Sequence, residues 1–75
     1  MMDKAFFAEK MKLLAGGFRD NSFTSELVLK AWYEFFKDIP DKVFADNVSY
    51  WIKANNKAPT VAELLHECKR DMGRA

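Results

Sequence analysis

The sequence predicts an all-α fold, in which one domain spanning residues 1–75 consists of four helices joined by short links. Apolar residues recur at helical spacing in four successive stretches, and proline, glycine and asparagine mark the breaks between them. Aromatic residues make up 15% of the chain, and their large buried area lets a short chain build a core. The expected helices occupy residues 3–16, 25–38, 40–54 and 61–72.

The first expected helix begins after Asp3, whose carboxylate can cap the free amides of the first turn. Its apolar stripe comprises Phe7, Met11, Leu14 and Phe18. We expect the helix to end at Gly16 and Gly17, because glycine readily adopts the positive φ found at many helix C-termini.

The second expected helix lies in the most apolar stretch, Phe23 to Asp38, and should therefore be the centre of the fold. Thr24 is predicted to be its N-cap, and Phe23 is predicted to pack on Val28 across the first turn. The residues expected to face inward are Val28, Ala31, Trp32, Phe35 and Phe36. A helix this apolar needs cover on more than one side, so the other helices should wrap around it.

The third expected helix starts near Pro40, because proline suits a first helical turn but not a helix interior. Its inward residues are predicted to be Phe44, Val48, Trp51 and Ile52. The polar residues 55–57 tolerate turn conformations and should end it.

Pro59 and the pair Thr60 and Glu63 indicate the start of the fourth expected helix, because the pair has the spacing of a capping box. In a capping box each side chain accepts a hydrogen bond from the other residue's backbone amide. The buried stripe is predicted to comprise Val61, Leu64, Leu65, Cys68 and Met72.

Composition narrows the classes of function. The net charge is +1 with acidic and basic residues interspersed, so the chain lacks the basic footprint of a nucleic-acid-binding protein. The single cysteine, Cys68, permits no internal disulfide, which favours a reducing compartment. No run of eighteen apolar residues or cleavable leader is apparent, so we expect a cytoplasmic protein with no membrane partner.

Four features in order carry a family resemblance: Thr24, the run WYEFFKD at 32–38 with Trp32 at its start, the third expected helix with Val43, Val48 and Trp51, and the run APTVAEL at 58–64. Together they resemble the phage helicase loader and inhibitor family, small replication proteins of Gram-positive bacteriophages and prophages. The resemblance covers roughly residues 23–68. It implies a non-enzymatic helical protein that binds the replicative helicase or its loader ATPase. Loading and inhibition require the same kind of interface, so the sequence does not distinguish them.

Two features depart from the family pattern. Ala58 stands where a second proline is common, which removes one backbone restraint and leaves the capping box intact. Family members often continue into a flexible polar tail that grips the helicase, whereas this sequence stops at Ala75. We expect either a trimmed domain or a short member whose partner contacts lie on the folded surface.

Catalytic and metal chemistry find little support. Glu63 and His66 have the Glu-x-x-His spacing of di-metal helix bundles, but the carboxylates of the other helices fall on predicted solvent faces. Capping is the better role for Glu63, and a small buried thiol is the better role for Cys68. Gly16 and Gly17 lack the lysine and hydroxyl residue of a phosphate-binding loop. We expect no catalytic residue, metal or cofactor.

DNA binding is an alternative. Residues 59–65 resemble the first helix of some helix-turn-helix modules, and Lys69, Arg70 and Arg74 follow. No recognition helix comes after them, and the acidic turn at 38–41 would repel phosphate at the other candidate helix pair. Direct nucleic-acid binding is therefore not the favoured interpretation.

Protein binding is the class the sequence favours, and a self-associating regulatory domain is a further alternative. Trp32, Phe35 and Trp51 are predicted to be core residues. Tyrosines on the polar side of a helix are reasonable interface anchors. The predicted partner-binding surface comprises Tyr33, Lys37, Tyr50 and Lys53.

Overall fold

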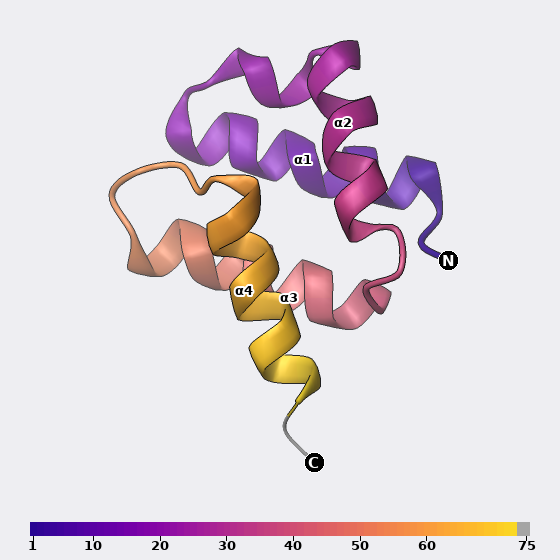
Figure 1. Cartoon of the computed structure of the whole chain (residues 1–75). Helices are drawn as coiled ribbons and strands as arrows, with labels where there is room; N and C mark the ends of the chain where they lie inside the picture. The colour runs from indigo at the N-terminus through magenta and orange to yellow at the C-terminus, as the bar shows by residue number, and fades with distance from the viewer. Residues whose placement is uncertain (74–75) are drawn as a thin grey trace.

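The computed structural model describes residues 1–73, and it confirms an all-α fold of four helices with no strand in that range. The helices are α1 (Lys4–Phe18), α2 (Glu26–Phe36), α3 (Asp41–Ala54) and α4 (Val61–Met72), and a 3-10 turn, η1 (Asn21–Thr24), precedes α2. α1 and α3 form two tiers, with α2 crossing α1 and α4 crossing α3 (Figure 1). Arg74 and the chain end at Ala75 lie outside the described residues.

α1 begins as predicted but ends later. Asp3 Oδ2 accepts a hydrogen bond from the Phe6 amide at 3.1 Å, which confirms the predicted cap. The helix runs through both glycines and ends at Arg19, which takes the left-handed conformation at φ 53°. The predicted end of the helix at the glycines is wrong, because Gly17 lies inside α1, where it packs against Ile52 of α3. A Cβ there would lie 3.0 Å from Ile52 Cγ2, so glycine lets α1 approach α3 closely.

The predicted N-cap of α2, Thr24, is wrong. Thr24 is the last residue of η1, and its hydroxyl donates a 2.9 Å hydrogen bond to the Asn21 carbonyl instead of accepting one from α2. Ser25 is the N-cap, and its side chain makes no capping bond. The reason is the extra turn η1. Asp20 opens this turn by accepting hydrogen bonds from the Ser22 amide at 3.0 Å and the Ser22 hydroxyl at 2.6 Å.

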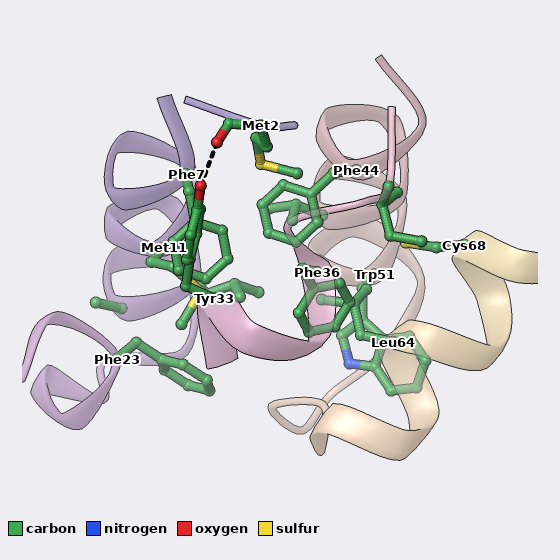
Figure 2. Packing of buried hydrophobic residues seen from close by; sticks show 14 residues of the cluster. Met2, Phe7, Met11, Phe23, Tyr33, Phe36, Phe44, Trp51, Leu64 and Cys68 are labelled. Atoms are coloured by element: carbon green, nitrogen blue, oxygen red, sulfur yellow. Dashed lines mark hydrogen bonds between the residues drawn. The ribbon is translucent and has the colours of Figure 1, made fainter. Parts of the chain in front are cut away.

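One hydrophobic cluster forms the core, and Figure 2 shows its members converging from all four helices, with Leu64 and Cys68 contributed by α4. Phe7, Phe36, Phe44 and Leu64 are almost completely buried. Five ring contacts link the cluster: Tyr33–Phe7 at 5.4 Å, Phe7–Phe44 at 5.3 Å, Phe44–Phe36 at 5.1 Å, Phe36–Trp32 at 5.9 Å and Trp32–Phe23 at 5.3 Å. Phe23 is thus anchored against the core, on the ring of Trp32.

The face that α2 turns inward differs from the predicted face. Phe36 is buried as predicted, but Phe35 is 58% exposed and Ala31 is exposed, while Tyr33 is only 9% exposed. The N-terminal arm explains this rotation. The Tyr33 hydroxyl donates a 2.6 Å hydrogen bond to the Met2 carbonyl, drawn as the dashed line in Figure 2. The Met2 amide in turn donates to the Lys37 carbonyl at 2.7 Å, and the Met2 side chain is buried.

α3 follows the prediction closely. It begins after Pro40, ends at Ala54 with Asn55 as its C-cap, and buries Phe44, Val48 and Trp51, while Ile52 is half-buried. Trp51 also donates from its indole Nε1 to the Lys57 carbonyl at 2.9 Å, which ties α3 to the loop before α4.

α4 has the predicted bounds and the predicted capping box. Thr60 Oγ1 accepts a hydrogen bond from the Glu63 amide at 3.2 Å, and Glu63 Oε1 accepts one from the Thr60 amide at 3.0 Å. Pro59 before the box is buried. Leu64 and Cys68 are buried as predicted, whereas Met72 is 47% exposed because it lies at the last turn.

Candidate protein-binding surfaces

The structure separates the four residues that were predicted to form one binding surface. Tyr33 lies in the core between α1 and α2, so its predicted exposure is wrong. Lys37 is half-buried, and its Nζ lies 3.2 Å from Glu34 Oε1. Tyr50 and Lys53 are exposed on α3, one helical turn apart. Only Tyr50 and Lys53 therefore share an accessible face.

Tyr50 borders a groove between α3 and α4, with a volume of about 360 Å³, that we call the α3–α4 groove. The other lining residues are Asp46, Asn47, Glu67, Arg70 and Asp71. Four of them pair with one another: Asn47 Nδ2 donates to Asp71 Oδ2 at 2.8 Å, and Arg70 Nη2 lies 3.4 Å from Glu67 Oε2. Asp46 pairs instead with Lys42, at 2.8 Å. Asn47 is the buried polar residue of the core, and it also donates to the Val43 carbonyl at 2.8 Å. The groove is thus a fixed polar surface with one aromatic ring, 56% exposed, at its side.

A second groove, of about 290 Å³, lies between α1 and α2. Its apolar wall comprises Phe7, Ala8, Leu29 and Tyr33. Lys4 lies at this groove with its Nζ 5.7 Å from the centroid of the Tyr33 ring, a cation–π distance. Tyr33 thus contributes a wall to this groove, although its hydroxyl is committed to the N-terminal arm.

A line of exposed apolar residues lies on α2, and sequence reasoning missed it. Leu27 is 78% exposed, Ala31 is exposed and Phe35 is 58% exposed. The three residues are spaced four apart, so they form one line along the helix, which we call the α2 stripe. The spacing was visible in the sequence, but so many residues of this helix are apolar that nothing marked these three as outward-facing.

The residues considered for metal or thiol chemistry are positioned for other roles. Glu63 caps α4, and the hydrogen bond from the Thr60 backbone amide lowers the pKa of its carboxyl. His66 is exposed. Burial, reinforced by the negative charges of Asp71 and Glu67, raises the pKa of the Cys68 thiol to about 12, so this thiol stays protonated near neutral pH. Within residues 1–73 no three His, Cys, Asp or Glu side chains are grouped to hold a metal ion.

The basic residues at the end of α4 form no large patch in the part of the chain described. Lys69 and Arg70 are exposed, and Arg70 is paired with Glu67. Arg74, the third of the predicted basic residues, lies outside the described range. None of the helices described is long and apolar enough to cross a membrane.

Fold and surfaces together define a small all-α protein with exposed aromatic and apolar side chains on α2 and α3. Comparison with protein-family models, with curated proteins and with solved structures finds no match to this chain.

Proposed function

We propose that this chain is a non-enzymatic replication protein of a phage or prophage, which binds the replicative helicase or its loader ATPase in the host cytoplasm. It acts by occupancy: covering a surface on one of these proteins changes which replication complex forms. The proposal starts from the resemblance of residues 23–68 to phage helicase loaders and inhibitors. Loading and inhibition use the same contact and differ in what that contact blocks or releases.

The observation that carries this proposal is the exposed Tyr50 beside the α3–α4 groove, with Lys53 one turn further along the same face. A tyrosine on a rigid helix contributes a large contact area at a low cost in conformational entropy, and tyrosine is enriched among residues that dominate binding energy. The groove beside it is held by the Asn47–Asp71 bond, so a partner meets a surface that is already ordered.

A direct binding experiment tests the proposal. Purified chain is titrated with the purified hexameric helicase and, separately, with the loader ATPase of a Gram-positive host, with and without ATP. We expect saturable binding to one of them, weakened about 10-fold or more by Tyr50→Ala and less by Lys53→Glu. The matched controls are Leu13→Ala and Lys12→Glu, which alter exposed side chains on α1 and should leave the affinity unchanged.

Each outcome has a definite meaning. Absence of binding to both proteins overturns the proposal. Binding that survives Tyr50→Ala and Lys53→Glu, but not the α1 variants, removes the α3–α4 groove as the contact surface. A helicase unwinding assay with the loader present then separates the two modes, because a loader raises the amount of helicase assembled on DNA and an inhibitor lowers it.

A further inference from the structure

We infer that the α2 stripe is a self-association surface, on which two copies of this chain pair through antiparallel α2 helices. This inference concerns the chain alone and does not depend on the helicase proposal. It rests on three properties of the outward face of α2: an exposed apolar line, a small residue at its centre, and a charge order that is complementary to itself.

The apolar line is unusual for a single exposed helix face. Leu27 and Phe35 are among the most exposed large apolar side chains of the described chain, and they belong to the same helix. Isolated exposed apolar residues are common on protein surfaces, whereas a contiguous line of them marks an interaction site. A line with a spacing of four is the pattern by which a helix docks along another helix.

Ala31 lies midway between the two large side chains, four residues from each. If a two-fold axis passes beside Ala31, each Leu27 is level with Phe35 of the other copy, so a large side chain packs against a large one at both ends. At the centre the two alanines face each other, and their small side chains let the two helix backbones approach closely. In this register the large side chains pack at both ends of the interface, and the two alanines leave room for the helices at its centre.

The charges beside the stripe favour the same arrangement. Lys30 and Glu34 lie on one flank of α2, and an antiparallel two-fold pairing brings this flank opposite the same flank of the other copy. Lys30 is then offset from Glu34 of the second copy by only about 3 Å along the helix axis, at 1.5 Å per residue. Each copy contributes one lysine and one glutamate, so two ion pairs form across the interface.

These charges are available for such pairing. Lys30 Nζ lies 3.3 Å from Glu26 Oε1, and Glu34 Oε1 lies 3.2 Å from Lys37 Nζ, but these pairs are between neighbouring turns and the side chains of Lys30 and Glu34 are 77% and 67% exposed. Exposed pairs of this kind contribute little to stability, so rearranging them costs little. A strongly acidic or basic partner would find no complementary field here, because both signs alternate along α2 at Glu26, Lys30 and Glu34.

The pairing should be reversible. α2 has 11 residues and is only about 16 Å long, so the interface falls at the small end of the range, below about 1,200 Å² in total. We therefore expect half of the chains to be paired at roughly 0.1–1 mM, in rapid exchange with monomers.

Sedimentation equilibrium of the full chain, from about 10 µM to about 1 mM, tests the inference. Wild type should pass from monomer towards dimer over this range, and Leu27→Glu or Phe35→Glu should weaken the association about 10-fold or more. The matched control is Leu13→Glu, an exposed apolar residue on α1, which should associate as wild type does. A wild type that stays monomeric at the highest concentration overturns the inference, as does a dimer that persists in both α2 variants.

Charge exchange tests the antiparallel register itself. Lys30→Glu alone places a carboxylate opposite Glu34 of the second copy, and Glu34→Lys alone places two ammonium groups together, so each variant should associate roughly 10-fold more weakly than wild type. An equimolar mixture of the two variants should recover association to within about 3-fold of wild type, because every cross-pair is again opposite in sign. A mixture that associates no better than its two components overturns this register. Far-UV circular dichroism on each variant verifies that the fold is retained.

Discussion

Helices α2 and α4 are similar in length, 11 and 12 residues, yet the sequence predicts α4 well and α2 poorly. In α4 the start, the end and the inward residues Leu64 and Cys68 match the prediction, and Met72 in the last turn, which is exposed, does not. In α2 the predicted cap is wrong and two inward assignments, Ala31 and Phe35, are reversed. The difference is compositional: only Glu26, Lys30 and Glu34 are polar in α2, apart from the Tyr33 hydroxyl and the Trp32 indole N–H. Several rotations of that helix would therefore bury a similar amount of apolar surface.

The spacing of apolar residues predicts the buried face of a helix only when polar residues occupy the rest of the helix surface. α4 meets this condition, and its capping box fixes where the helix begins. α2 is oriented instead by contacts with residues distant in sequence: the hydrogen bond from Tyr33 to Met2 and the ring contact of Tyr33 with Phe7. Its outward face consequently retains apolar side chains that are free to contact another chain.

The strongest test of the α2 orientation uses two adjacent phenylalanines. Phe36 is fully buried against Phe44, whereas Phe35 is 58% exposed. Phe36→Ala should lower the free energy of unfolding by about 3–5 kcal/mol, a large part of the roughly 4–11 kcal/mol expected for a chain of this size. Phe35→Ala should change it by less than about 0.5 kcal/mol. Urea denaturation followed by circular dichroism at low micromolar protein measures both, and equal losses would show that α2 is oriented differently.

The second test concerns the bond between the N-terminal arm and α2. Tyr33→Phe removes the hydroxyl that donates to the Met2 carbonyl at 2.6 Å and should destabilise the fold by about 1 kcal/mol. Tyr50→Phe is the matched control, because Tyr50 is 56% exposed, and should have an effect within about 0.5 kcal/mol of zero. The same urea measurement applies. If Tyr50→Phe were the more costly change, the arm would not be what holds α2 in this rotation.

How far the sequence predicts this protein depends on how local each determinant is. Asp3, the Thr60–Glu63 box and the inward stripe of α3 act within a few residues, and all were predictable. The features that the sequence did not predict depend on contacts between residues distant in sequence. Gly17 leaves room for Ile52 of α3, and the hydrogen bond from Tyr33 to Met2 turns Tyr33 inward and Phe35 outward. Of the predicted binding residues only Tyr50 and Lys53 are exposed together, because the polar side of α3 is well marked and that of α2 is not.

The third test compares the caps of the two helices. Thr60→Ala removes the side-chain acceptor of the Glu63 amide and should lower the free energy of unfolding by about 1 kcal/mol. Ser25→Ala is the matched change at the start of α2, where the side chain makes no capping bond, and should cost less than about 0.5 kcal/mol. The measurement is the midpoint temperature of thermal unfolding of each variant, compared with that of wild type. A larger shift for Ser25→Ala would mean that α2, and not α4, is the helix fixed by its cap.

The smallest expected effect is a pH dependence of the folding stability that arises from the same capping box. The Thr60 backbone amide, which donates to Glu63 at 3.0 Å, is the main reason that the pKa of this carboxyl is lowered from its ordinary value of 4.5; the charge of Lys57 adds to it and partial desolvation opposes it. A carboxyl whose pKa is lower in the folded state stabilises the fold above its ordinary pKa, and this stabilisation is lost as the pH falls through the folded value. Glu63→Gln keeps a side-chain acceptor and removes the charge, so the difference in the free energy of unfolding between wild type and Glu63→Gln should be measurable near pH 7 and decline below pH 4.5.

Asp20 should leave some acid sensitivity in every one of these variants, because the hydroxyl and amide of Ser22 also lower its pKa. The comparison of wild type with Glu63→Gln isolates Glu63, since Asp20 is unchanged in both proteins and its contribution cancels. A difference in stability that stays constant from neutral pH to well below the ordinary pKa would show that Glu63 caps α4 equally well in its protonated form. In that case the two hydrogen bonds of the capping box, and not the charge of Glu63, would fix the start of α4.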